Sequence, residues 1–111
     1  MKLNFDDHEQ LTVVAIKGDL NAESTEALRK AALEKLNKTT RDFVLDLHEM
    51  EFIDSKGLES LLWLQDQCGE RLGQIRLAGA SENFQKVLEM TRLTPRFECT
   101  ADVEAAIKSL R

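Results

Sequence analysis

The chain has 111 residues, of which 42% are hydrophobic and 32% are charged, and its 15 basic and 20 acidic side chains give a formal net charge of −5. This hydrophobic content excludes a disordered chain, and the length suits one domain, which we expect to span residues 1–111. The acidic balance argues against direct binding of a nucleic-acid backbone or an anionic membrane. The apolar runs are too short to span a bilayer and no apolar signal segment opens the chain, which predicts a cytoplasmic protein without membrane insertion.

Cysteine and histidine usage argues against an enzyme. Cys68 and Cys99 lie in apolar-patterned segments, so we expect reduced core residues rather than a disulfide. His8 and His48 have neither metal-ligand spacing nor a nucleophile–base motif, and we expect both to be exposed polar side chains. The sequence also contains no P-loop and no GxGxxG motif. We therefore expect no catalytic site, no metal and no cofactor.

Strand and helix patterns alternate along the chain. Short β-branched or alternating apolar runs predict a weak edge strand, three stronger strands and a short last strand, at residues 2–6, 11–17, 42–47, 74–78 and 97–99. A turn at residues 8–10 would join the first two strands as a hairpin. Apolar side chains at helical spacing predict four helices: Asn21 caps the first, the second begins at Ser55, Ser81 caps the third and the fourth begins at Thr100. Strands alternating with helices of this length favour βαβ units and an α/β fold.

The segment after the strand at 42–47 is the strongest candidate for a functional loop, because sites in such sheets gather beyond the carboxyl ends of the strands. Phe52 and Ile53 are apolar and are expected to anchor it, whereas Asp54 and Ser55 are residue types that cap helices. A glycine in the first helical turn, such as Gly57, costs roughly 1 kcal/mol relative to alanine unless another segment approaches closely. On these residues alone, a helix N-cap is the favoured interpretation of Asp54 and Ser55.

The segment Val44-Leu-Asp-Leu-His-Glu-Met-Glu-Phe-Ile-Asp-Ser-Lys-Gly-Leu58 resembles the signature of STAS domains, in particular the anti-sigma factor antagonists. In that family a strand of the form (V/I)-(L/V)-(D/N)-L leads into (F/I)-(I/M/V)-D-S-x-G-L. The order of the predicted elements fits over the whole chain, and Gly18-Asp-Leu-Asn21 stands where the family often has G-E-L-D. The resemblance implies the STAS fold, a mixed and mostly parallel sheet of about five strands with four α-helices mainly on one face.

The resemblance implies that Ser55 is a phosphorylation site. In antagonists of this type, the serine after the aspartate is phosphorylated by a partner anti-sigma factor that is also a Ser/Thr kinase of the GHKL class. The unphosphorylated antagonist binds the anti-sigma factor and frees the sigma factor, phosphorylation releases it, and a metal-dependent phosphatase resets it. We expect a monomer when free, with no enzymatic activity of its own and with partner contacts at Asn21, Asp54, Lys56, Gly57, Glu59 and Trp63.

Two positions depart from the family's pattern. Lys56 stands where many members have a second serine, which leaves Ser55 as the single obvious acceptor and changes the local charge. Asn21 stands where many have an aspartate that helps to engage the kinase.

A phosphate on Ser55 would face helix N-terminal amides and the positive end of the helix dipole. It would add about −1.5 to −2 charges near three acidic side chains, Glu51, Asp54 and Glu59. We therefore expect release by electrostatic and steric mismatch rather than by refolding.

Trp63 gives an independent prediction. At 100° per residue, Leu58, Leu61, Leu62 and Gln65 share one side of the second helix, and Trp63 falls opposite, near Lys56, Ser60 and Gln67. An exposed tryptophan is a common interface anchor, but it can equally lie flat on the neighbouring surface.

Two other functions are compatible with parts of the sequence. A phosphate-receiver domain would explain Asp6, Asp7 and Asp46, but its acidic pair should end a core strand that feeds a helix, and here the pair precedes a strand. The serious alternative lies within the family. A STAS subunit of a lipid-transport ATPase complex, or of a sensory assembly, would use the same fold as a docking module without this kinase cycle.

Overall fold

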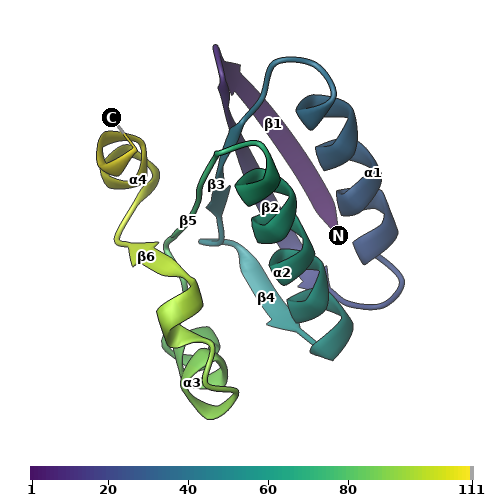
Figure 1. The fold of residues 1–111 in the computed structure, drawn as a ribbon. Coiled ribbons are helices and arrows are strands. Elements are labelled where there is room, and N and C mark those ends of the chain that lie inside the picture. The colour runs from purple at the N-terminus through teal and green to yellow at the C-terminus, as the bar shows by residue number, and fades with distance from the viewer. Residues whose placement is uncertain (111) are drawn as a thin grey trace.

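A mixed sheet with helices on both faces organises residues 1–110, which the computed structural model describes (Figure 1). Residue 111, the last of the expected domain, lies outside the described residues. The elements in chain order are β1 Lys2–His8, β2 Leu11–Leu20, α1 Thr25–Leu36, β3 Asp42–Asp46, β4 Met50–Ile53, α2 Ser55–Glu70, β5 Ile75–Ala78, α3 Glu82–Met90, the 3₁₀ turn η1 Thr94–Arg96, β6 Glu98–Thr100 and α4 Val103–Ser109.

The sheet runs in the order β1-β2-β3-β5-β6, and β4 pairs with the far end of β2. β1 and β2 form the predicted antiparallel hairpin, whereas the other pairings are parallel. The predicted α/β class and the mixed, mostly parallel STAS-type sheet are therefore confirmed. The sheet has six strands, one more than expected, because β4 lies where the sequence analysis placed only a loop.

Apolar side chains on both faces of the central strands build two core clusters. Val14 and Ile16 of β2 belong to the larger cluster, under α1, α2 and α3, whereas Val13 belongs to the smaller one, under α4. β3 alternates in the same way, with Phe43 in the larger cluster and Val44 in the smaller. Three of the four helices thus share one core, and Figure 1 shows α4 across the sheet from α1.

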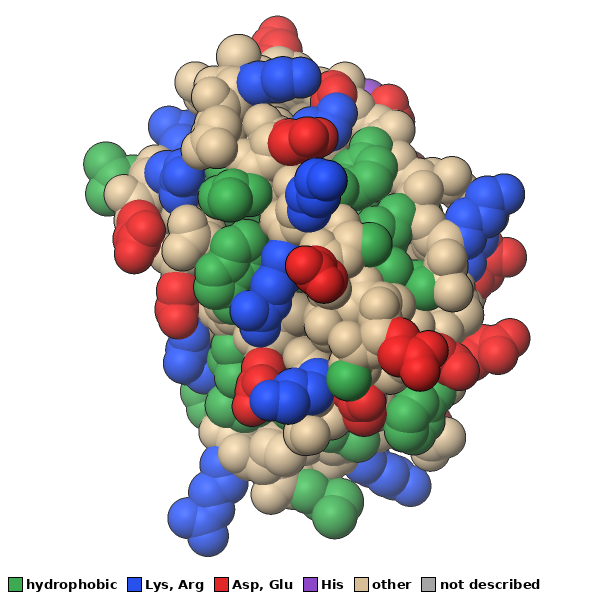
Figure 2. Space-filling model, turned by 90° about the vertical axis from the view of Figure 1, so that its right-hand side faces the viewer, with side chains coloured by type: hydrophobic (Ala, Val, Ile, Leu, Met, Phe, Trp, Pro, Cys, Tyr) green, Lys and Arg blue, Asp and Glu red, His purple; other side chains and the backbone are tan. Residues whose placement is uncertain are grey.

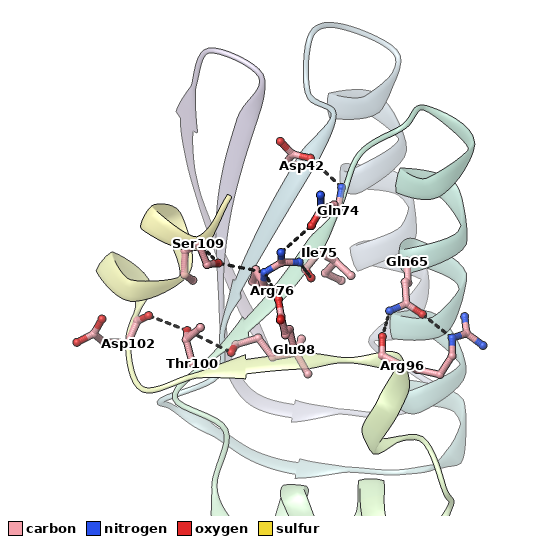
Figure 3. Close-up of polar contacts among 12 residues, drawn as sticks. Asp42, Gln65, Gln74, Ile75, Arg76, Arg96, Glu98, Thr100, Asp102 and Ser109 are labelled. Carbon is pink, nitrogen blue, oxygen red and sulfur yellow. Dashed lines mark hydrogen bonds and ion pairs between the residues drawn. The ribbon is translucent and has the colours of Figure 1, made fainter. Parts of the chain in front are cut away.

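Arg76 of β5 connects the neighbouring strand β6 with α4, which lies on the second face of the sheet (Figure 3). Its side chain is only 13% exposed, and its Nε lies 3.0 Å from Ser109 Oγ and 2.7 Å from Glu98 Oε2. Its Nη2 donates to Gln74 Oε1 at 2.6 Å. A guanidinium that is partly buried needs such partners, because unpaired donors are costly to bury.

Three predicted boundaries shift for identifiable reasons. β2 continues past Gly18 to Leu20, because Gly18 adopts φ +88° beside a bulge that lets the strand go on. α1 begins at Thr25, with Ser24 rather than Asn21 as its N-cap, because Asn21 Oδ1 accepts from the amides of Glu23 and Ser24 in the turn before the helix. Thr100 ends β6, and Asp102 caps α4 by accepting from the amide of Ala105 at 2.8 Å.

Two predictions about burial are wrong in part. Ser60, on the side of α2 opposite the predicted apolar side, is fully buried, and its hydroxyl donates to the Gly57 carbonyl at 2.6 Å. Gln65 and Leu62 are only half-buried. Both cysteines are free, but Cys99 is exposed, since it lies on the short edge strand β6 rather than in the core with Cys68.

Candidate functional site

The segment that leads to Ser55 is fixed by main-chain pairing with β2. β4 runs parallel to the end of β2, with Asp19 opposite Phe52 and Leu20 opposite Ile53. The amide of Asp54 then donates to the Leu20 carbonyl at 3.2 Å. The start of α2 is thus held by the sheet, and four strand residues were too few for their pattern to predict β4.

Asp54 is the N-cap of α2, as its residue type indicated. Its Oδ1 accepts from the amide of Gly57 at 2.8 Å, and its Oδ2 accepts from the amide of Ala22 at 3.3 Å. One carboxylate therefore caps α2 and ties it to the loop before α1. The N-cap interpretation and a functional role for Ser55 are compatible, because the cap uses Asp54 alone.

Gly57 is required by a close approach of two segments. A Cβ placed on Gly57 would lie 2.3 Å from the Leu20 carbonyl oxygen and 2.8 Å from Ile53 Cγ1. Both distances are shorter than any van der Waals contact, and the obstructing atom at Leu20 is main chain. The glycine lets the first turn of α2 lie directly against the end of β2.

Ser55 is exposed as the first residue of α2. It sits at the positive end of the helix dipole, where an anion is stabilised. Beside it, Lys56 Nζ lies 3.4 Å from Glu59 Oε2, and both side chains are largely exposed. Lys56 therefore supplies a positive charge next to Ser55, although Glu59 partly balances that charge.

Asn21 organises the turn between β2 and α1. Its Oδ1 accepts from the main-chain amides of Glu23 and Ser24 at 3.0 and 3.2 Å. Its main-chain amide donates to Ser24 Oγ at 2.9 Å. The Ala22–Asp54 hydrogen bond brings this turn to the start of α2. The structure thus gathers Asn21, Asp54, Ser55 and Gly57 in one region.

Trp63 is half-buried rather than exposed. The guanidinium carbon of Arg29 lies 5.5 Å from the centre of its ring, and the ring packs against the larger core cluster. A partly desolvated cation over an indole is stabilising, so packing accounts for this residue. The geometry favours the alternative in which Trp63 lies on the neighbouring surface, and its contact with a partner stays a prediction.

Phe52 is an exposed side chain that the sequence analysis assigned to the wrong role. It is 57% exposed and does not anchor the segment, whereas Ile53 packs against the core as predicted. Period-two alternation explains the difference, because adjacent residues of β4 point to opposite faces. Because the sequence analysis treated β4 as a loop, this alternation was not applied to Phe52 and Ile53.

His8 and His48 are exposed, as predicted. His48 Nδ1 lies 2.6 Å from Asp46 Oδ1, and this hydrogen bond raises the pKa of His48 above its ordinary value, against an opposing effect of burial. Within residues 1–110 no three His, Cys, Asp or Glu side chains are grouped to hold a metal ion. In the same range no helix is both long and apolar enough to cross a bilayer.

Charges of both signs are interspersed on the side of the molecule where α1 lies, with apolar patches between them (Figure 2). The net charge of −5 is therefore not concentrated into a single-sign field on this face.

Known proteins resemble this chain over nearly its whole length. An anti-sigma factor antagonist by name, BtrV of Bordetella bronchiseptica, is 25% identical over 111 residues, which cover 100% of this chain and 96% of BtrV. Among solved structures, TM1081 of Thermotoga maritima, named as an anti-sigma factor antagonist, superposes with a TM-score of 0.91 and 21% identity, covering 98% of this chain and 94% of TM1081.

The anti-sigma factor antagonist SpoIIAA of Bacillus matches in two forms. Its unphosphorylated form has a TM-score of 0.81 with 18% identity, covering 99% of this chain and 98% of SpoIIAA. Its phosphorylated form has a TM-score of 0.80 with 19% identity, covering 99% of this chain and 100% of SpoIIAA. The family model described as "Mlab, STAS domain" matches residues 3–95. This chain belongs to the STAS domain family, whose members are typically non-enzymatic regulators.

Proposed function

We propose that the chain is an anti-sigma factor antagonist that switches partners through Ser55. Unphosphorylated, it binds an anti-sigma factor of the GHKL Ser/Thr kinase class, and phosphorylation of Ser55 releases it. A metal-dependent phosphatase restores the binding form. The observation that carries this proposal is the exposed Ser55 hydroxyl at the first position of α2, directly after the Asp54 cap.

The fixed backbone around Ser55 supports the proposal, because a kinase needs an accessible hydroxyl in a defined position. The pairing of β4 with β2 holds the segment before Ser55, and the close approach at Gly57 holds the segment after it. A site already in its bound conformation loses little conformational entropy on binding.

The position of Ser55 also allows a phosphate without refolding. The dianion would lie at the helix N-terminus, where main-chain amides and the dipole stabilise it. The phosphorylated and unphosphorylated forms of SpoIIAA resemble this chain almost equally, with TM-scores of 0.80 and 0.81. The same fold therefore suits both states of the proposed switch.

Release would follow from like charges at the contact. A partner surface shaped for the neutral Ser55 hydroxyl would meet a phosphoserine carrying about −1.5 to −2 uncompensated charges. Lys56 offsets only part of this charge, since it is exposed and already near Glu59. Close like-charge contacts cost several kcal/mol, which is enough to dissociate a regulatory complex.

Phosphorylation of the intact chain tests the proposal. We would incubate it with ATP and each GHKL-class kinase of its organism and map phosphate by tandem mass spectrometry. We expect a single phosphate on Ser55, none in Ser55→Ala, and none on Ser60, which is buried and serves as an internal control. Binding of the same kinase should persist in Ser55→Ala and fall in Ser55→Asp.

Equal binding of the kinase by the wild type, Ser55→Ala and Ser55→Asp would contradict the proposed switch, and so would phosphate at a different residue. A docking module of a lipid-transport ATPase complex or a sensory assembly is the second candidate. It is supported by the same match to a STAS domain model over residues 3–95, because this alternative would use the same fold. Stable co-purification with transporter subunits, without phosphorylation, would select this alternative.

A further inference from the structure

An apolar groove lies between β4 and α3. Its walls are formed by Met50, Phe52 and Ile53 on one side and by Phe84 and Val87 on the other, and it encloses about 210 Å³. Phe52 is 57% exposed at its edge. Within residues 1–110, β4 pairs only with β2, and Figure 1 shows α3 beside β4. We call this feature the β4–α3 groove.

A cleft with acidic walls adjoins the groove. Asp19, Glu23 and Glu51 line it, together with Gly18 and with Met1, whose N-terminal amine adds one positive charge to the cleft. Within the described part of the chain these three exposed carboxylates have no ion-pair partner. The lysines nearby in sequence are paired elsewhere, Lys17 with Glu49 and Lys56 with Glu59. We call this feature the acidic cleft.

The two features form one continuous surface beside Ser55. Glu51 lines both the groove and the cleft. Strand pairing places Asp19 next to Phe52, and the Ala22–Asp54 hydrogen bond joins the wall of the cleft to the start of α2. A partner that covers Ser55 therefore also meets an apolar groove and a cleft that is net negative, with three carboxylates and one terminal amine.

We propose that the β4–α3 groove and the acidic cleft together bind one segment of the partner protein that carries a basic and a large apolar side chain. The apolar side chain enters the groove against Phe52, and the basic side chain enters the cleft between Asp19, Glu23 and Glu51. This inference rests on the proposed function, because it describes the partner that contacts Ser55. Charge complementarity selects this occupant over a second copy of the chain, whose own acidic cleft would be repelled.

Capped synthetic hexapeptides that carry one arginine and one leucine, separated by zero to three glycines, provide the probe. Titration into ¹⁵N-labelled protein should shift the amides of β4, of residues 19–24 and of the start of α3. Replacing arginine by glutamate, or leucine by serine, should remove most of the shifts. The shifts should also weaken as salt rises, because exposed charges are screened.

Matched variants separate the two halves of the surface. Glu23→Gln and Glu51→Gln should each weaken the arginine–leucine peptide about two- to five-fold at low salt, whereas Glu104→Gln, remote on α4, should leave it unchanged. Phe52→Ala should weaken it about three- to ten-fold at all salt concentrations. Met90→Ala, also strongly exposed on α3, serves as the apolar control. Thermal unfolding of each variant verifies that the fold is intact.

The peptide and the kinase give distinguishable answers. Ser55→Asp adds a carboxylate beside the acidic cleft, so this variant should bind the basic peptide at least as tightly as the wild type, although it should lose the kinase. Shifts that spread over unrelated surfaces, or equal binding of the arginine and glutamate peptides, would overturn this inference. Such a result would leave the phosphorylation of Ser55 unaffected. Localised, charge-dependent peptide binding without phosphorylation would support the inference and contradict the kinase cycle.

Discussion

Gly57 shows how one residue without a side chain can set the geometry of a site. The first turn of α2 and the end of β2 approach until no Cβ fits between them. The penalty for glycine in a helix, roughly 1 kcal/mol, is therefore offset by a contact that alanine cannot make. Neither composition nor spacing could reveal this approach, since it involves Leu20, far away in the sequence.

Gly57→Ala should destabilise the protein strongly. The new methyl group would meet the Leu20 carbonyl at 2.3 Å, and main chain cannot rotate away as a side chain can. We expect a loss of about 2 kcal/mol or more in unfolding free energy, measured by urea denaturation. Gly69→Ala is the matched control, because nothing lies within 4 Å of its Cβ, and it should stabilise α2 by about 0.5–1 kcal/mol. Equal effects of the two substitutions would contradict this account.

His48 should make stability depend on pH near neutrality. Asp46 raises the pKa of His48 above its ordinary value of 6.5, so the folded state holds the proton more tightly than the unfolded state. The resulting stabilisation is fully present below pH 6.5 and is lost as pH rises through the raised pKa. His48→Gln should remove this slope from urea unfolding measured between about pH 5.5 and pH 8.5. An unchanged slope in the variant would show that another group titrates.

At the scale of the elements, α4 depends on one partly buried guanidinium. Arg76 joins β5 to Glu98 of β6 and to Ser109 near the end of α4. α4 has only seven residues, too few to be stable without such contacts. Its apolar side chains cover the smaller core cluster, so loosening α4 would expose Val13 and Val44.

Arg76→Met should release α4 and β6 before the rest of the molecule unfolds. We expect a loss of about 1–3 kcal/mol, because Glu98 and Ser109 lose their shared partner. Hydrogen exchange should accelerate in α4 and β6 more than in β2 and β3. Lys108→Met breaks an exposed pair on the same helix and should cost less than about 0.5 kcal/mol. Uniform acceleration throughout the sheet would contradict a local role.

Sequence patterns predicted the elements best where a strand is buried on both faces. Phe43 and Val44 fill opposite cores, and their continuous apolar run identified β3. β4 was not predicted, because a strand of four residues paired beside a bulge shows no clear alternation of apolar and polar side chains. Ser60 and Cys99 were misplaced because their burial depends on which neighbours cover α2 and β6, and residue type does not encode those neighbours.

At the scale of the whole molecule, the fold should be insensitive to charge at Ser55. Ser55→Asp places a negative charge at the helix N-terminus, which is worth about 0.3–1 kcal/mol in favour of the folded state. We expect an unchanged circular dichroism spectrum and equal or slightly higher thermal stability than Ser55→Ala. A large loss of stability, or a changed spectrum, would mean that phosphorylation acts by refolding.

The candidate site was predictable in its residues but not in its surroundings. The motif around Asp54 and Ser55 predicted the helix cap, and the structure confirms Asp54 as the cap with Ser55, the proposed acceptor, as the first residue of α2. The role of Phe52 required the sheet, because its exposure follows from the direction of β4. The place of Asp19 near the site also required the sheet, because Asp19 pairs with Phe52, which is distant in sequence.

The attachment of β4 to β2 has a consequence for how such regulators can diverge. Main-chain hydrogen bonds position Ser55, and they form whatever side chains β4 carries. Side chains such as Glu51 and Phe52 are exposed and can be exchanged with little effect on folding. Duplicated copies of such a domain could therefore acquire new partners by surface substitutions alone, while the main chain at Ser55 keeps its position.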